Sequence, residues 1–189
     1  KSDATGSWVV FRDFHLYYEG QDLTALEGVR TTLVEEAQKI AANTVTTAAY
    51  EALQAVIKEA NDANTVSTLT SANNKLRATI DATYAMVEPY STYQTLLTQV
   101  NTDLSNSTGD QETLNSAIAK QNEALDAAMT VKEIDDARKG LLDAYQTYLE
   151  TAVPTEGHSV DLTFRLKNPT CTENSGWDKF EGNVSGGYN

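Results

Sequence analysis

A repeat with a spacing of 65 residues constrains the fold of this chain more than any other feature. The stretch TVSTLTSANNKL begins at Thr65, and TVKEIDDARKGL begins 65 residues later, at Thr130. The same offset places apolar residues on apolar residues: Leu53 on Ile118, Ala63 on Ala128, Leu69 on Ile134, Ala72 on Ala137 and Leu76 on Leu141. Self-similarity of this kind indicates a structural unit that is duplicated along the chain.

Each copy has the apolar spacing of three helices. Between about residues 22 and 152 the chain is rich in Ala, Leu, Gln, Glu and Asn, and its one proline there is Pro89. In the first copy the predicted apolar stripes are Leu23, Leu26, Leu33, Ala37 and Ile40; Ala49, Leu53, Val56 and Ala60; and Val66, Leu69, Ala72, Leu76, Ile80 and Val87. In the second copy they are Tyr93, Leu96, Val100 and Leu104; Leu114, Ala117, Ile118 and Leu125; and Val131, Ile134, Ala137, Leu141, Ala144 and Tyr148.

These stripes predict two slender three-helix bundles in tandem, at residues 21–88 and 89–153. Narrow apolar faces with many alanines are typical of antiparallel helices packed in such bundles. A unit of about 65 residues is marginal alone, so contact with a neighbouring unit would add stability. Pro89 marks the expected joint between the bundles, because a helix that reaches a proline must end or kink there.

The two ends of the chain, residues 1–20 and 154–189, have a different pattern. Residues 7–18 are aromatic and β-branched, with Trp8, Val10, Phe14, Leu16 and Tyr18 on one side at a period of two. Residues 159–169 alternate apolar and polar side chains more regularly, and each stretch predicts a β-strand. The predicted fold class is therefore mainly α, with two tandem three-helix bundles and a short β-strand segment at each end. A lone strand exposes its backbone, so each of these strands must pair with something.

Composition and charge exclude several classes of partner. Hydrophobic residues make up 40% of the chain and charged residues 22%, which is enough apolar surface for a folded core. The net charge of −13 would repel a nucleic-acid backbone or an anionic membrane surface. No apolar run approaches the roughly 18 residues of a transmembrane helix. We therefore expect no nucleic-acid partner and no membrane insertion within this chain, which also lacks an initiating Met, as expected of a fragment or processed form.

Patterns typical of catalysis or metal binding are not found in the sequence. His15 and His158 lack the spacing that offers zinc two imidazoles from one helix. The single cysteine, Cys171, can form neither an internal disulfide nor a thiolate metal site within one chain. The adjacent carboxylates at 35–36 and 135–136 point apart on a helix, whereas a glycosidase needs two that face each other. We expect no enzyme activity, no cofactor and no metal.

Four aromatic residues are the candidates for ligand binding: Tyr84, Tyr90 and Tyr93 around the joint, and Trp177 in the stretch SGWDKF. Tyrosines suit sugar and protein surfaces because they combine a flat apolar face with a hydroxyl. The alternative for the tyrosines is packing between the bundles, which the helical spacing favours for Tyr93. The alternative for Trp177 is a position in the core of a β-structure.

The ends and the body of the chain resemble known families. The stretch from Trp8 to Tyr18, followed by EGQDL, resembles the closing strand of a galactose-binding-like β-sandwich from multidomain surface proteins of the Bacteroidetes type. The stretch VDLTFRLKNPTCTENSGW is similar to the first strand and loop of another such sandwich, and the helical body resembles tandem FIVAR-like repeats. Each end supplies about one strand of the seven or eight that a sandwich needs. Two arrangements stay open: the end strands pair with each other, or the helical body is an insertion in one sandwich.

The resemblance implies a secreted or cell-surface protein in which a helical spacer separates sandwich modules that often bind sugars. Together with the missing catalytic patterns, it predicts a non-catalytic structural spacer or interaction module whose partners are neighbouring β-sandwich modules. One alternative is a helical binding module that holds a glycan or a surface protein. Another is the accessory region of a glycoside hydrolase in polysaccharide use. Bundles placed end to end would favour the spacer, and bundles folded side by side would weaken it.

Overall fold

The computed structural model describes residues 22–162. This part contains five α-helices, a 3-10 helix and two very short strands: α1 (Leu23–Ala37), η1 (Ala42–Thr44), α2 (Thr47–Asp62), α3 (Val66–Ser105), β1 (Ser107–Thr108), α4 (Gln111–Asp126), α5 (Val131–Leu149) and β2 (Val153–Pro154). The fold is mainly α, as predicted. The predicted strand at residues 7–18 lies outside the described residues. The strand predicted at 159–169 has no counterpart in 159–162, and its remainder also lies outside them.

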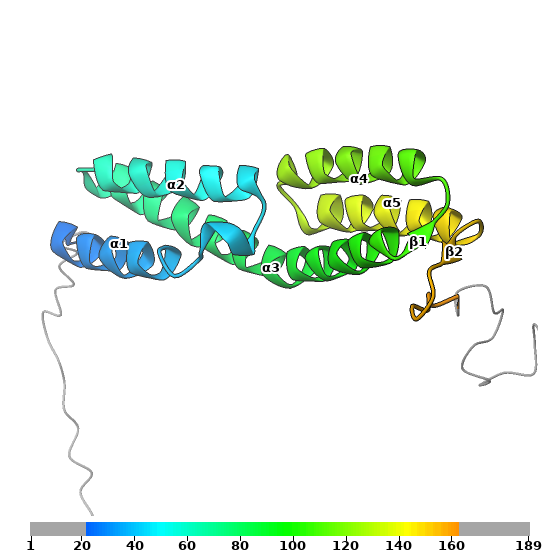
Figure 1. The fold of residues 1–189 in the computed structure, drawn as a ribbon. Helices are drawn as coiled ribbons and strands as arrows, with labels where there is room; N and C mark the ends of the chain where they lie inside the picture. Colours follow the sequence, from blue (N-terminus) through cyan, green and yellow to red (C-terminus); the bar gives the residue numbers. More distant parts are fainter. Residues whose placement is uncertain (1–21, 163–189) are drawn as a thin grey trace, which may run out of the picture.

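The helices form two three-helix bundles placed end to end (Figure 1). In the first bundle α1 and α2 pack on each other and on the first part of α3, and in the second α4 packs on α5, which packs on the rest of α3. The helix α3 therefore belongs to both bundles. Its 40 residues span about 60 Å at the usual rise per residue.

Pro89 lies inside α3 and does not end it. The expected boundary between residues 88 and 89 is therefore inside a continuous helix that the two bundles share. Proline has no N–H to donate to the carbonyl of Ala85 one turn earlier, and its ring crowds that carbonyl. The axis of α3 changes direction near its middle, as a proline inside a helix predicts (Figure 1). The helix continues because Met86 and Tyr93, on either side of Pro89, are both held in a buried core.

The repeated Thr-Val pair starts a helix in both bundles. The hydroxyl of Thr65 accepts a hydrogen bond from the backbone N–H of Thr68 at 3.2 Å, and that of Thr130 accepts one from Glu133 at 3.2 Å. Both threonines are therefore N-caps, which satisfy a donor that the first turn of a helix leaves free. The repetition seen in the sequence thus includes the signal that begins α3 and α5.

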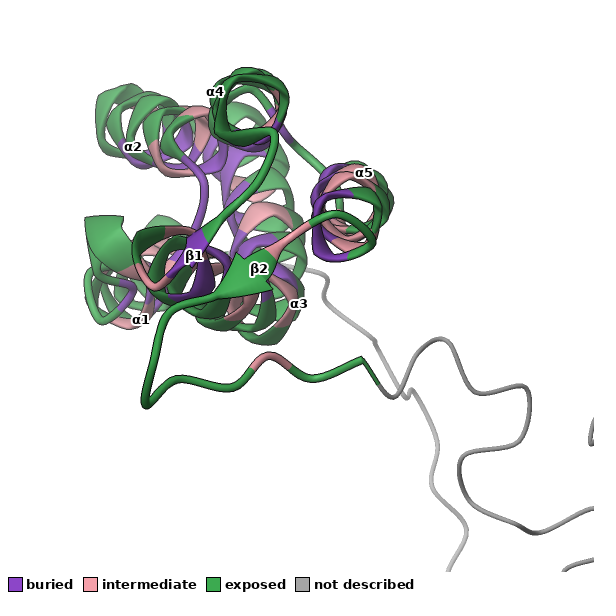
Figure 2. Cartoon of the chain, turned by 45° about the vertical axis from the view of Figure 1, so that its right-hand side comes forward, coloured by how far each residue is buried: buried purple, intermediate pink, exposed green. Residues whose placement is uncertain are grey.

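Each bundle has its own buried core, and the repeated stripes form it. Figure 2 shows the buried residues on the inner faces of the helices. Leu69, Leu76, Ile134 and Leu141, which the 65-residue offset relates in pairs, are all fully buried. Two members of the predicted stripes, Leu23 and Val66, are instead exposed by about two fifths of their surface. The other stripe residues are buried or half-buried, but the core also contains residues outside the stripes, such as Val45, Ile57 and Leu149.

A small antiparallel sheet closes the far end of the second bundle, and the sequence did not predict it. The strand β1 follows α3 and pairs with β2, which follows α5, with Ser107 opposite Pro154 and Thr108 opposite Val153. Thr155 adds two hydrogen bonds to the carbonyl of Asn106, from its backbone N–H and from its hydroxyl, each at 2.9 Å. The segment after α5 is thereby tied across the end of α3.

Candidate functional site

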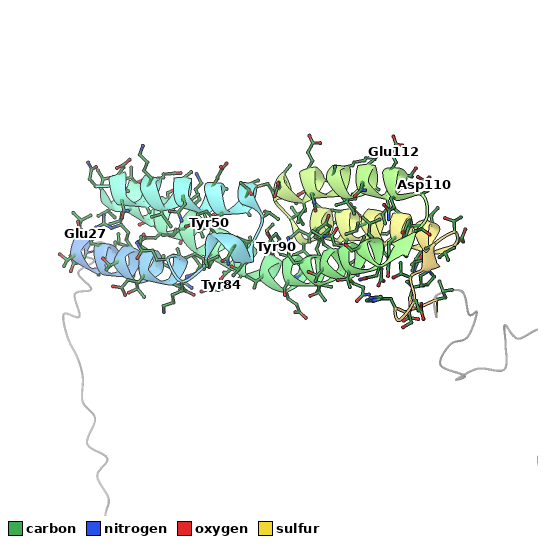
Figure 3. The ribbon with its side chains drawn as sticks, viewed as in Figure 1. Glu27, Tyr50, Tyr84, Tyr90, Asp110 and Glu112 are labelled. Carbon is green, nitrogen blue, oxygen red and sulfur yellow. The ribbon has the colours of Figure 1, made fainter. Side chains whose placement is uncertain are left out.

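The three tyrosines expected around the joint do not form one patch, because Tyr84 lies on another face of α3 than Tyr90 and Tyr93. Tyr84 and Tyr93 are nine residues, or about two and a half turns, apart, so their side chains leave the helix on opposite sides. Tyr84 is 42% exposed, and its hydroxyl lies 3.5 Å from the carbonyl oxygen of Glu36 in α1. Tyr90 is half-buried against the core of the second bundle, and Figure 3 shows its place relative to Tyr84. A shared aromatic platform is therefore not formed.

Tyr93 is a core residue, as its place on the predicted stripe indicated. It is fully buried, and its hydroxyl donates a hydrogen bond to Oδ1 of Asn122 in α4 at 2.9 Å. Burial, and secondarily the negative charge of Asp126, raise the pKa of Tyr93 to about 12. The phenol thus stays neutral near pH 7 and joins α3 to α4. Trp177, the fourth candidate, lies outside the described residues.

Tyr50 in α2 is an aromatic residue that the sequence analysis did not single out. It is half-buried and lines a hollow of about 410 Å³ with Ala42, Thr47, Glu51 and Gln54. A tyrosine ring beside a carboxylate, an amide and a hydroxyl offers both an apolar face and hydrogen-bonding groups to a polar ligand. The sequence gives little indication of a site here, because Tyr50 follows the stripe residue Ala49 and resembles any residue on the side of an amphipathic helix.

A larger hollow of about 690 Å³ lies between the end of α2 and the start of α3. Its lining consists of short or charged side chains: Ala55, Lys58, Glu59, Asp62, Ala63, Ser67, Thr68, Ser71 and Ala72. Near it, Lys75 and Glu59 form an ion pair in which both side chains are about half exposed.

The joint between the bundles is held by side-chain contacts as well as by the continuous backbone of α3. Thr46, the N-cap of α2, is fully buried, and its hydroxyl donates a hydrogen bond of 2.6 Å to the carbonyl oxygen of Ala128. Ala128 lies in the loop between α4 and α5, 82 residues away in sequence. Ala49 of α2 and Met86 of α3 are part of the same buried cluster as Ala128. Sequence analysis missed this contact because Thr46 reads only as the start of a helix.

A buried polar cluster lies at the far end of the second bundle. The carboxylate of Asp103 in α3 is 5% exposed and accepts hydrogen bonds from the hydroxyl of Tyr145 and, at 2.9 Å, from the side-chain amide of Gln99. The hydroxyls of Ser107 and Tyr148 lie 2.9 Å apart beside it. These groups satisfy one another, so they serve the packing of α3 on α5. Sequence patterns gave no sign of a buried acid, because an acid on a helix is usually solvated.

The adjacent acids of α5 lie on a solvated face. Asp135 pairs with Arg138, and Asp136 pairs with Lys132, in ion pairs whose side chains are between two fifths and four fifths exposed. Across residues 22–162, no three His, Cys, Asp or Glu side chains are grouped so that they could hold a metal ion. In the same part of the chain no helix combines the length and the apolar character needed to cross a membrane.

Comparison with protein-family models, with curated proteins and with solved structures gave no match. The resemblance of the helical body to FIVAR-like repeats, and of the ends to β-sandwich strands, therefore stays a prediction from the residues that carry it.

Proposed function

We propose that this chain is a non-catalytic structural spacer of a secreted or cell-surface multidomain protein, which holds neighbouring modules apart. The observation that carries the proposal is the end-to-end placement of two bundles along one shared helix (Figure 1). End-to-end placement makes the pair of bundles longer than side-by-side placement would. The same helices folded side by side would separate their neighbours by about half that distance.

The two points at which neighbouring modules would be attached support this function. The described chain begins with Asp22 at the start of α1 and leaves the second bundle after β2, and these points lie at opposite ends of the molecule (Figure 1). Glu27 and Glu112 mark the same two ends in Figure 3. A module before α1 and a module after β2 would therefore be separated by about the length of α3, roughly 60 Å.

Distance measurement between the ends tests the spacer. Ala25→Cys in α1 and Glu112→Cys in α4 are both at exposed sites, and Cys171→Ser in the same chain confines spin labels to these two positions. Double electron–electron resonance should give a narrow distribution of distances centred near the length of α3, about 60 Å. A main population at half this distance or less would contradict the spacer, because it would show that the bundles fold back on each other in solution.

A second candidate function, a carbohydrate-binding helical module, is favoured by the hollow beside Tyr50. The ring of Tyr50 would stack on a sugar face while Glu51 and Gln54 bind its hydroxyls. Screening of the chain against an array of neutral and acidic glycans, followed by calorimetry with any glycan retained, tests this function. Tyr50→Ala should abolish the binding and Tyr84→Ala should leave it unchanged. Equal binding by the chain and by Tyr50→Ala would place the site elsewhere.

A further inference from the structure

The continuity of α3 does not by itself make the two bundles one rigid body. Pro89 removes one hydrogen bond from the helical ladder at the point where the bundles meet, and a helix interrupted in this way bends more easily. A rod connected through Pro89 alone would therefore have a hinge at its centre. Whatever holds the bundles in line must come from contacts that bridge the joint beside α3.

Thr46 makes such a contact, and the geometry of its hydroxyl leaves little freedom. The hydroxyl donates its hydrogen to the carbonyl of Ala128 at 2.6 Å and accepts a hydrogen bond from the backbone N–H of Ala49 at 3.3 Å. One donor and one acceptor are thus satisfied by two groups in different bundles. Thr46 and Ala128 are at most 2% exposed, so a broken bond would leave polar atoms away from water.

Apolar packing surrounds this hydrogen bond on the same side of the joint. Ala49 and Met86 come from helices of the first bundle, yet they belong to the buried core of the second, with Ala128. Met129, next in the loop, lines a hollow of about 300 Å³ with Met86 and Ala49. The loop between α4 and α5 thus lies on the start of α2 through one buried hydrogen bond and a shared apolar core.

We propose that Thr46 acts as a latch that locks the two bundles in line and opposes bending of α3 at Pro89. With the latch closed the chain is one rigid rod, and with the latch open Pro89 becomes a hinge. This inference deepens the proposed spacer function, because a spacer that bends freely does not hold a distance. The stiffness of the joint can be measured separately from the spacer function.

The test compares the widths of the distance distributions between labels at Ala25→Cys and Glu112→Cys in the Cys171→Ser chain. Thr46→Val keeps the shape of the side chain and removes the hydroxyl, so we expect the distribution to broaden about two-fold. Thr46→Ser restores the hydroxyl and should restore the narrow distribution. Thr65→Val is the matched control, because it removes an N-cap hydroxyl at an exposed site far from the joint.

The pattern of widths decides the proposal. A broader distribution in Thr46→Val but not in Thr65→Val supports the latch. Equal widths in Thr46→Val and the parent chain would overturn it. Equal broadening by Thr65→Val would also overturn it, because the effect would then belong to helix capping in general. A short mean distance in the parent chain would instead contradict the spacer and leave the latch to be judged by the change in width.

A second variant keeps the proposal testable if Thr46→Val does not fold. Pro89→Ala returns the missing backbone donor to the middle of α3. In the parent chain it should change the width little, because the latch already holds the joint. In a chain with Thr46→Ala, which also lacks the hydroxyl, Pro89→Ala should reverse at least half of the increase in width. No reversal would show that Pro89 is not the hinge.

Discussion

The hydroxyl of Tyr145 in α5 donates a hydrogen bond to the buried carboxylate of Asp103 in α3. This pair joins the last helix of the second bundle to the helix that both bundles share. Burial, and then the hydrogen bond and negative charge of Asp103, raise the pKa of Tyr145. The amide of Gln99 is a second donor to the same carboxylate. A buried carboxylate depends on such donors, since losing one leaves charge away from water without compensation.

Tyr145→Phe should therefore destabilise the chain by more than the loss of an ordinary hydroxyl. We expect the free energy of unfolding to fall by about 1–3 kcal/mol, because a charged acceptor loses a partner. Urea denaturation followed by circular dichroism measures this change. Tyr148→Phe is the matched control, and it removes a hydrogen bond between two neutral hydroxyls, with an expected loss of about 0.5–1.5 kcal/mol. Equal losses in the two variants would show that the charge of Asp103 does not matter.

Stability should fall in alkaline solution because of Tyr93 and Tyr145. Both have a pKa above the usual value of about 10, and that of Tyr93 is raised to about 12. Above pH 10 the unfolded chain gives up these protons while the folded chain keeps them, so the unfolded state is favoured. The stabilisation is complete below pH 10 and is lost as the pH rises toward 12.

Urea midpoints at pH 8, 10 and 11 measure the alkaline effect. The midpoint should drop between pH 10 and 11 in the parent chain, and the drop should be smaller when Tyr93→Phe removes one of the two phenols. A midpoint that is the same at pH 8 and pH 11 would mean that neither phenol is held in its neutral form by the fold.

Two glycines should respond in opposite directions to alanine. A Cβ at Gly109 would lie 2.9 Å from Cε2 of Tyr148 and 3.3 Å from the backbone of Ala152, so Gly109→Ala should lower the free energy of unfolding by about 1–3 kcal/mol. Gly28 is inside α1, and a Cβ there meets no atom within 4 Å. Gly28→Ala should raise stability by about 0.5–1 kcal/mol. Thermal melts of both variants test this contrast, and a stabilising Gly109→Ala would show that the segment after α5 does not pack on the loop before α4.

The repeated N-cap should contribute measurably to the second bundle. Thr130→Ala removes the cap of α5 and should cost about 1 kcal/mol in urea denaturation. Hydrogen bonds from the backbone of Met129 and from Thr130 lower the pKa of Glu133. The stability that the Glu133 carboxylate adds to the folded chain should therefore be lost as the pH falls below the usual pKa of a glutamate. Thr102→Ala is the control, because its hydroxyl only bonds a carbonyl within the same helix. If Thr130→Ala lowers the free energy of unfolding no more than Thr102→Ala does, the N-cap of α5 does not stabilise the chain.

The sequence by itself determined the local features of this protein. Apolar residues three and four apart must face one side of a helix, so the stripes located the helices and most of the buried core. The 65-residue offset that relates Leu69 to Ile134 and Leu76 to Leu141 can be recognised in the amino-acid sequence, and all four residues are buried. The threonines that begin α3 and α5 act through a backbone group only three residues away. Each of these properties depends on neighbours along the chain.

Only the tertiary structure decided how these parts are joined. Whether a helix ends or bends at Pro89 depends on what holds its flanks, and here the buried Met86 and Tyr93 hold both. The bond from Thr46 to Ala128 joins groups 82 residues apart, and a threonine at a helix start gives no sign of it. In the sequence Asp103 cannot be distinguished from a solvent-exposed acid, and only the structure shows its hydrogen bond from Tyr145. These outcomes depend on contacts between distant residues, which the local spacing of side chains does not encode.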